Sequence, residues 1–265
     1  MKTVKWLTEI MENWAPLSYA ESWDNVGLLI GDSNKEIKNV LVALDVTDDV
    51  VEEALEGGFD FIISHHPIIY NPISKLVASD PISKKILMLI KHNIGLYSSH
   101  TNLDKAAYGV NDVLALKLGL KNISPLIPEE SHGEGIGIGR VGNLPEPKTL
   151  KNFAEYVKNI LGLSEVRYAG DLNTEILTVG LCGGDGSNGS FLKAAAKRNC
   201  HVYITGDLRY HMTHEALDLG LNLLDIGHYN SEKIIVETIV NRFKKEGINI
   251  KATKTKGKVL KVIQS

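Results

Sequence analysis

The stretch Phe61–Pro67, FIISHHP, is a short apolar run that ends in two adjacent histidines. Two glycines lie shortly before the run and a proline follows it. A short apolar run bounded by such residues is typical of a buried strand. His65 and His66 should therefore lie where the strand ends, the edge at which open α/β sheets place their chemistry. Neighbouring strand positions point to opposite faces, so the pair alone does not establish a site.

Two further apolar runs end in a similar way. NIGLYSSHTNLD delivers His100 and Asp104, and LNLLDIGHYNSE delivers His228 and Glu232. In both segments the carboxylate follows the histidine by four residues. Strand ends that repeatedly carry imidazole and carboxylate predict that these side chains are parts of one site.

The composition is that of an ordinary globular protein. With 265 residues, 43% hydrophobic and 23% charged, the chain can form one large domain or two smaller ones. A net charge of −3 and a pI near 6.3 argue against a nucleic-acid binder. Cys182 and Cys200 have no metal-ligand spacing, which fits a reducing compartment. We find no signal-peptide pattern and no apolar segment long enough to span a membrane, so we expect a cytoplasmic protein.

Strand and helix patterns alternate along the chain after an amphipathic helix expected over residues 3–14. Such strand–helix–strand units form parallel sheets with right-handed crossovers. We predict an α/β fold of two lobes, each a mostly parallel sheet flanked by helices, with the Pro-, Gly- and charge-rich stretch 122–147 at the lobe boundary. The predicted divisions are residues 1–124, 125–227 and 228–265, the last a helix and strand that return to the first lobe.

Polar residues at element ends give three local expectations. Trp23, Asp24 and Asn25 precede the apolar VGLLIG. A turn held by the Asp and Asn side chains is the favoured interpretation of this group, and a place in the site is the alternative. One helix is predicted to be capped near Asn111, and Ser231 is predicted to cap the long amphipathic helix that follows it.

A glycine-rich turn offers a rival to a metal site. Gly184, Gly186 and Gly189 fit the G-x-G-x-x-G pattern after a strand and at a helix start, with Asp207 further along. Formally this is the dinucleotide fingerprint, in which amides and the helix dipole face a pyrophosphate. We favour a tight turn that joins strand and helix, and leave open whether the turn binds a phosphate.

The types of donor atom in the predicted site limit the number and the identity of the metal ions that it could bind. A single structural zinc normally completes its shell with cysteines. Imidazoles together with carboxylates, one of them able to bridge, suit two divalent ions about 3.5 to 4 Å apart with positions open to water. This ligation favours Zn, Mn, Fe or Co without choosing among them. His100 is a further candidate, either as a supporting residue or as a general acid or base. The predicted ligands are His65, His66, Asp104, His228 and Glu232.

The motifs HHPIIY, SSHTNLD, GHYNSE and ESWDNVGLLIG together resemble the NIF-three-like dinuclear-metal-centre family, whose members are often named GTP cyclohydrolase I type 2 or its homologues. The resemblance spans nearly the whole chain and places the family's metal ligands on the same five residues. It implies a two-lobed α/β subunit with two divalent ions in the cleft between the lobes, and a toroidal homohexamer. Some relatives carry an inserted domain, and the short distance between Asp104 and the strand at Ile176 resembles the form without it.

The resemblance implies a metal-dependent hydrolase acting on a small molecule or nucleotide. In a cyclohydrolase, a metal-activated water would attack a purine ring such as C8 of GTP and formate would be released. His100, or His211 and His214 on a predicted helix, could transfer protons. Two alternatives remain, a metal-handling or metal-donor protein and a ring-shaped interaction scaffold without turnover.

Overall fold

The computed structural model describes residues 2–257, which fold as two compact units. The first unit contains the described residues up to Leu103 and again from Ile235 onward. The second unit contains Asp104–Ile234. Residues 258–265, the end of the third predicted division, lie outside the described residues.

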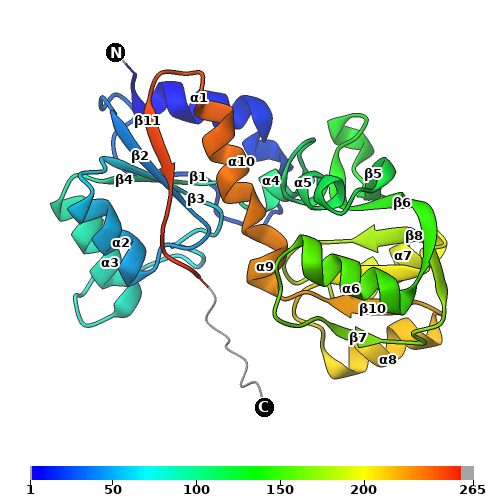
Figure 1. The fold of residues 1–265 in the computed structure, drawn as a ribbon. Coiled ribbons are helices and arrows are strands. Elements are labelled where there is room, and N and C mark those ends of the chain that lie inside the picture. Colours follow the sequence, from blue (N-terminus) through cyan, green and yellow to red (C-terminus); the bar gives the residue numbers. More distant parts are fainter. Residues whose placement is uncertain (1, 258–265) are drawn as a thin grey trace. The chain divides into compact units, whose positions relative to one another are not determined.

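The first unit is built on a five-stranded sheet in the order β1-β4-β3-β2-β11 (Figure 1). The pairs β4–β3, β3–β2 and β2–β11 are parallel, whereas β1 is antiparallel to β4. This sheet is therefore mostly parallel, as predicted, and the described part of the expected C-terminal strand is its edge strand β11. The strands span Gly27–Ile30 (β1), Asn39–Ala43 (β2), Phe61–Ser64 (β3), Gly95–Ser98 (β4) and Asn249–Ala252 (β11).

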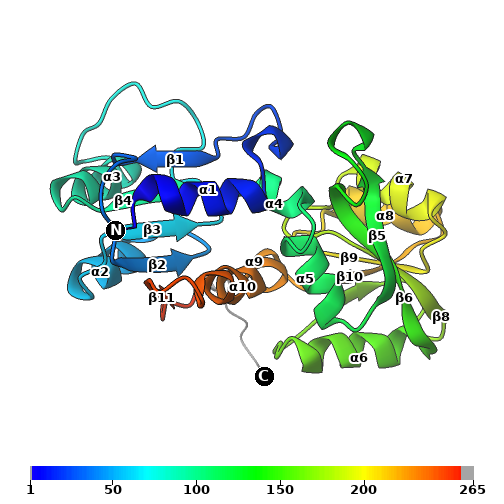
Figure 2. The same ribbon diagram turned by 90° about the horizontal axis from the view of Figure 1, so that it is seen from above.

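Helices cover both faces of this sheet. The helices α2 and α3 lie on one face, where Val50 and Ile86 belong to the same buried cluster as Leu41 of the sheet. The helices α1 and α10 lie on the other face (Figures 1 and 2), and the ring edge of Trp6 meets the ring of Phe243 with centroids 6.0 Å apart. The helices span Val4–Trp14 (α1), Asp48–Glu56 (α2), Pro81–Lys91 (α3) and Ile234–Phe243 (α10).

The predicted N-terminal helix is confirmed as α1. It begins after Thr3, whose side chain accepts a hydrogen bond from the backbone N–H of Trp6. This bond satisfies one of the amides that a helix start leaves without a partner. In the apolar stripe expected from the sequence, Val4, Leu7, Met11 and Trp14 are buried and Ile10 is half-buried.

The second unit is built on a six-stranded sheet in the order β5-β6-β8-β9-β10-β7. The neighbours β8, β9 and β10 are parallel, while β5–β6, β6–β8 and β10–β7 are antiparallel. The two-sheet α/β fold is confirmed, but this sheet is mixed and not mostly parallel. Its strands span Lys121–Pro128 (β5), Gly137–Thr149 (β6), Arg167–Ala169 (β7), Glu175–Leu181 (β8), Val202–Thr205 (β9) and Asn222–Asp225 (β10).

The stretch 122–147, expected to separate the lobes, is largely the antiparallel β5–β6 pair. Pro125 and Pro128 are tolerated because β5 is an edge strand, where missing N–H donors break no ladder. Pro145 and Pro147 lie in β6 between Asn143 and Lys148, where the pairing with β8 shifts register. Gly137 has φ +152°, and a Cβ there would lie 2.2 Å from the carbonyl oxygen of Ile127. The prolines and Gly137 therefore mark an edge strand, an interruption of the ladder and a close approach of two backbones, which composition alone does not distinguish from a linker.

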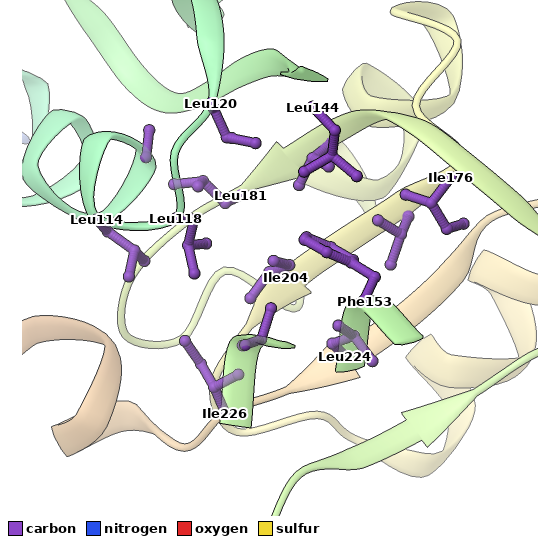
Figure 3. Packing of buried hydrophobic residues seen from close by; sticks show 14 of the residues in the cluster. Leu114, Leu118, Leu120, Leu144, Phe153, Ile176, Leu181, Ile204, Leu224 and Ile226 are labelled. Carbon is purple, nitrogen blue, oxygen red and sulfur yellow. The ribbon is translucent and has the colours of Figure 1, made fainter. Parts of the chain in front are cut away.

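The second sheet is also covered on both faces. The helices α5 and α6 pack on one face, where Phe153 points into a cluster with Leu114, Ile204 and Leu224 (Figure 3). The helices α7 and α8 belong to a second cluster, which contains Tyr203 on the opposite face of β9. Each buried Leu, Ile or Phe contributes about 1.5 to 3 kcal/mol. The helices span Val110–Lys117 (α5), Leu150–Ile160 (α6), Gly189–Lys197 (α7) and Tyr210–Asp218 (α8).

Candidate metal centre

Three parallel strands of the first sheet end in line. The register pairs Ala43 with Ser64 and Ser64 with Ser98, so the residues that follow β2, β3 and β4 leave the sheet at one edge. The hydroxyl oxygens of Ser64 and Ser98 lie 2.7 Å apart and link two of these strand ends. Because β1 is antiparallel and pairs Gly27 with Ser98, the residues before β1 reach the same edge.

The histidines at this edge form a cluster. His65, His66 and His100 each offer a ring nitrogen, and the three nitrogens lie within 4.8 Å of one another. The ring centroids are 4.9 to 5.3 Å apart. His65 and His66 gather on one side, although neighbouring residues of a strand would point apart, because β3 ends at Ser64 and the pleat no longer applies.

Each of these imidazoles is held through its Nδ1 atom. His66 Nδ1 lies 2.7 Å from Asp45 Oδ1, and His100 Nδ1 lies 2.9 Å from Asp24 Oδ1. His65 Nδ1 lies 2.8 Å from the carbonyl oxygen of Ser99, which can only accept, so this nitrogen carries the proton. Donation from Nδ1 fixes the ring orientation and leaves the Nε2 lone pair for another partner, as in histidines that bind metals.

Asp24 is the most strongly anchored carboxylate of this edge. Its Oδ2 accepts hydrogen bonds from the hydroxyl of Thr101 at 2.6 Å and from the Thr101 backbone N–H at 3.0 Å. Burial would raise the pKa of Asp24, but the hydrogen bond and charge of His100 and the two bonds from Thr101 lower that pKa to about 2. Asp24 also accepts from the N–H of Asn25. Asp24 therefore holds the expected turn, and it also contacts His100 of the histidine cluster.

The second sheet repeats this arrangement. Its register pairs Leu181 with Ile204 and Thr205 with Asp225, so β8, β9 and β10 also present their carboxyl ends at one edge. The short helix α9 (His228–Glu232) begins at this edge and carries two of the predicted ligands, four residues apart. Residues far apart in the sequence thus converge where parallel strands end, in both units.

His228 and Glu232 contact each other on α9. His228 Nε2 lies 3.1 Å from Glu232 Oε2, and His228 Nδ1 lies 2.7 Å from Asp207 Oδ2. Ser231 lies inside α9, and the long helix α10 begins only at Ile234, so the predicted cap of that helix at Ser231 is wrong. The Ser231 hydroxyl donates to the carbonyl of His228 at 2.6 Å. It accepts at 2.9 Å from the N–H of Gly184 in the glycine-rich turn.

The glycine-rich turn packs closely against His228 and Glu232. Gly184 has φ +66°, and a Cβ there would lie 2.3 Å from Glu232 Oε1 and 3.3 Å from His228 Nε2. Asp207, which a dinucleotide fingerprint would place on a ribose, instead contacts His228. The first amides of α7 bond to the side chain of its N-cap, Asn188. These contacts oppose the dinucleotide interpretation, because a carboxylate faces the first glycine and the helix start is already capped.

The backbone beside Asp104 is held by two buried side chains. Asp104 lies on the short helix α4 (Thr101–Lys105), and its carbonyl accepts from Asn111 Nδ2 at 3.0 Å. Asn111 Oδ1 accepts from the N–H of Gly183 at 2.8 Å. Asn111 lies within α5, whose N-cap is Gly109, so the helix begins near Asn111 as expected.

Arg140 is the second of these side chains, and it is almost completely buried. Its guanidinium donates to the carbonyls of Lys105 and Ala106 at 3.2 and 3.1 Å and forms an ion pair with Asp112. The segment that follows Asp104 is therefore tied to β6. Sequence reasoning missed this role, because nothing in the local pattern distinguishes Arg140 from a surface arginine.

Negative charge gathers in the second unit near these ligands. Burial, followed by the charges of Asp104 and Glu232, raises the pKa of the Cys182 thiol well above its ordinary value. Both cysteines are buried and unbridged. His211 and His214 lie on α8, where their rings contact Tyr210, and within residues 2–257 neither belongs to a group able to hold a metal.

The fold and these side chains define an α/β protein with two sheets, in which imidazoles and carboxylates that could bind a metal gather at the carboxyl ends of parallel strands. Residues 2–258 match the family described as Duf34/NIF3 (NGG1p interacting factor 3), and the chain belongs to that family. The resemblance inferred from the sequence motifs is thereby confirmed. In the described residues, we find no helix with the length and hydropathy needed to cross a bilayer.

Named relatives agree with this assignment. The chain is 39% identical over 226 residues to a "GTP cyclohydrolase 1 type 2 homolog" of Clostridium perfringens, covering 85% of each protein. A Bacillus subtilis protein of the same name is 30% identical over 359 aligned positions, covering 94% of this chain and 95% of that protein. That alignment is longer than the 265 residues of this chain, so the Bacillus subtilis protein has a segment that this chain lacks. The crystal structure of a Bacillus cereus protein related to NIF3 matches with a TM-score of 0.93 at 27% identity, covering 99% of each chain.

Proposed function

We propose that this protein binds two divalent metal ions and uses them to hydrolyse a small-molecule or nucleotide substrate. The proposed ligands are His65, His66, Asp104, His228 and Glu232. One observation carries the proposal. All four histidines at the strand ends turn Nδ1 toward a carboxylate or a carbonyl, which is how metal-binding histidines are oriented.

The residues present fit such ions. Imidazole and carboxylate donors suit Zn, Mn, Fe or Co, and the burial of Glu232 beside His228 gives a carboxylate that could bridge. When bound, the two ions would activate a water molecule and polarise the substrate. The protein's own contribution is to fix the rings and carboxylates, so that little reorganisation is needed when the ions and substrate bind.

His100 is the proposed proton-transfer group. Its Nδ1 is held by Asp24, whose side chain is fully buried, so the ring is fixed in one orientation. Two edge-on contacts, with His65 and His66, place the ring within the cluster. A histidine with one nitrogen anchored can donate or accept a proton at the other, which is the role of a general acid or base.

The proposed reaction is opening of a purine ring, as at C8 of GTP, with release of formate. The name carried by the relatives, GTP cyclohydrolase 1 type 2 homolog, supports this choice of substrate. We further propose, from the family resemblance, that the protein is a cytoplasmic toroidal homohexamer. Light scattering tests the assembly, because a hexamer would be far above the mass of 29.1 kDa of one chain.

Metal content and formate release, measured on the same untagged sample, test the function. Plasma mass spectrometry should find close to two ions per chain, and incubation with GTP should release formate. His66→Ala should lose metal and formate together, whereas His92→Ala, at an exposed position after α3, should change neither. Two ions without formate would reject the cyclohydrolase reaction and favour hydrolysis of another substrate or a metal-handling role. Full metal content in His66→Ala would remove His66 from the ligand set.

A further inference from the structure

Two large aromatic side chains of the first unit are half exposed. The exposed fraction is 53% for Trp23, in the turn before β1, and 51% for Tyr70, in the loop after β3. Their ring centroids lie 5.8 Å apart and the ring planes are inclined by 48°. Tryptophan and tyrosine are usually buried to a large extent, so an exposed pair in contact is a common feature of binding surfaces.

The pair is continuous with the histidine cluster. The edge of one ring meets the other between Trp23 and His100, whose centroids are 6.1 Å apart. His100 in turn lies 5.2 Å from His65 and 5.3 Å from His66, measured between ring centroids. A row of ring contacts therefore leads from the exposed Tyr70 to the buried His65 within a single unit.

Both aromatic residues have anchored neighbours. Asp24, next to Trp23, is fixed by its bonds to His100 and Thr101. Asn25 Nδ2 donates to the carbonyl of Ile69, the residue before Tyr70, at 2.6 Å and so ties the two loops together. The backbone that carries the two exposed rings is thus held in place by hydrogen bonds. Because less of it has to become ordered when a ligand binds, the entropy cost of binding is lower.

We propose that Trp23 and Tyr70 form a stacking platform for the planar heteroaromatic ring of the substrate, of which a purine base is the representative. This inference rests on the proposed function, because it places the ring beside the histidines that would act on it. Stacking needs only the π-face of the ring. Recognition of this kind explains why the sequence contains no evident set of groups that would read the edge of a guanine base.

Binding without turnover tests the platform. Isothermal titration calorimetry on the full chain would compare guanosine 5′-monophosphate with ribose 5-phosphate, which lacks the ring. We expect the wild type to bind the nucleotide more tightly than the sugar phosphate. Trp23→Ala should weaken nucleotide binding by about tenfold or more, and Tyr70→Ala by a smaller factor. Trp23→Phe, which keeps an aromatic face, should retain most of the affinity.

Tyr168→Ala provides the control, because Tyr168 is a similarly exposed tyrosine on β7 of the other unit. Equal nucleotide affinity in the wild type and Trp23→Ala would overturn the platform, as would equal binding of nucleotide and sugar phosphate. A change of oligomeric mass in Trp23→Ala would also overturn it and assign the pair to a subunit contact. Metal content, measured in every variant, separates the two ideas: absence of metal in the wild type rejects the metal-dependent function, while the nucleotide comparison still decides the platform.

Discussion

The Nδ1 atom of His66 lies 2.7 Å from the Oδ1 atom of Asp45, a residue that follows the neighbouring strand β2. The same relationship joins His228 to Asp207, again across neighbouring parallel strands. In each case the acidic residue leaves one strand and the histidine leaves the next. The geometry follows from the parallel register, which brings successive strand ends to the same edge.

Replacing Asp45 by Asn should weaken metal binding without unfolding the protein. An amide can either donate to or accept from His66 Nδ1, so the tautomer is no longer fixed, and loss of such a partner typically costs about 10- to 100-fold in metal affinity. Competition with a chromogenic chelator measures the change. Asp218→Asn, at the exposed end of α8, is the control. Unchanged affinity in Asp45→Asn would show that His66 needs no carboxylate partner.

Gly184→Ala should abolish metal binding. Its Cβ would lie 2.3 Å from Glu232 Oε1, so the carboxylate must move. Gly162→Ala is matched in backbone strain, with φ +63° against +66°, but has nothing within 4 Å of the added Cβ. Both variants should lose about 1 kcal/mol of stability from the left-handed conformation, measured by thermal unfolding without metal. Only Gly184→Ala should lose metal, and equal metal content in the two variants would reject the crowding argument.

The sequence identified the strand ends that carry the histidines, because an apolar run bounded by glycine and proline is a local signal. It did not identify Asp24, Asp45 and Asp207 as their partners. Each lies beside a predicted strand, but its pairing depends on which strands are neighbours and in which direction they run, and periodicity carries no such information. A search for acidic residues at every strand end would have found all three.

Strand neighbours and directions were also missed in the second sheet. The prolines and glycines of β5 and β6 were interpreted as a boundary because edge strands and linkers share that composition. Missing this hairpin removed the antiparallel pair β5–β6 from the prediction. The cap predicted at Ser231 was also misplaced, since Ser231 lies inside α9 and its hydroxyl accepts from the N–H of Gly184.

Asp24 should make the free energy of unfolding depend on pH in the acidic range. Its pKa is lowered from 3.8 to about 2 in the folded chain, so the carboxylate contributes stability that is fully present above pH 3.8 and is lost as the pH falls through about 2. The contribution is on the order of 2 kcal/mol. Urea unfolding of metal-free protein at fixed concentration measures it. The stability difference between the wild type and Asp24→Asn should shrink from pH 5 to pH 2, and a constant difference would show that the charge of Asp24 is not responsible.

Arg140→Lys should destabilise the second unit despite keeping the charge. The guanidinium of Arg140 uses its donors on one carboxylate and four carbonyls, and a lysine ammonium has too few donors to satisfy them. Buried acceptors left without partners should cost about 3 kcal/mol or more in urea unfolding. Arg198→Lys is the control, because Arg198 is exposed and its guanidinium donates to the hydroxyl of Ser124. Since Arg140 also holds the carbonyls that follow Asp104, metal affinity should fall in Arg140→Lys and stay constant in Arg198→Lys. Similar stability and metal affinity in the two variants would show that the segment after Asp104 is held without Arg140.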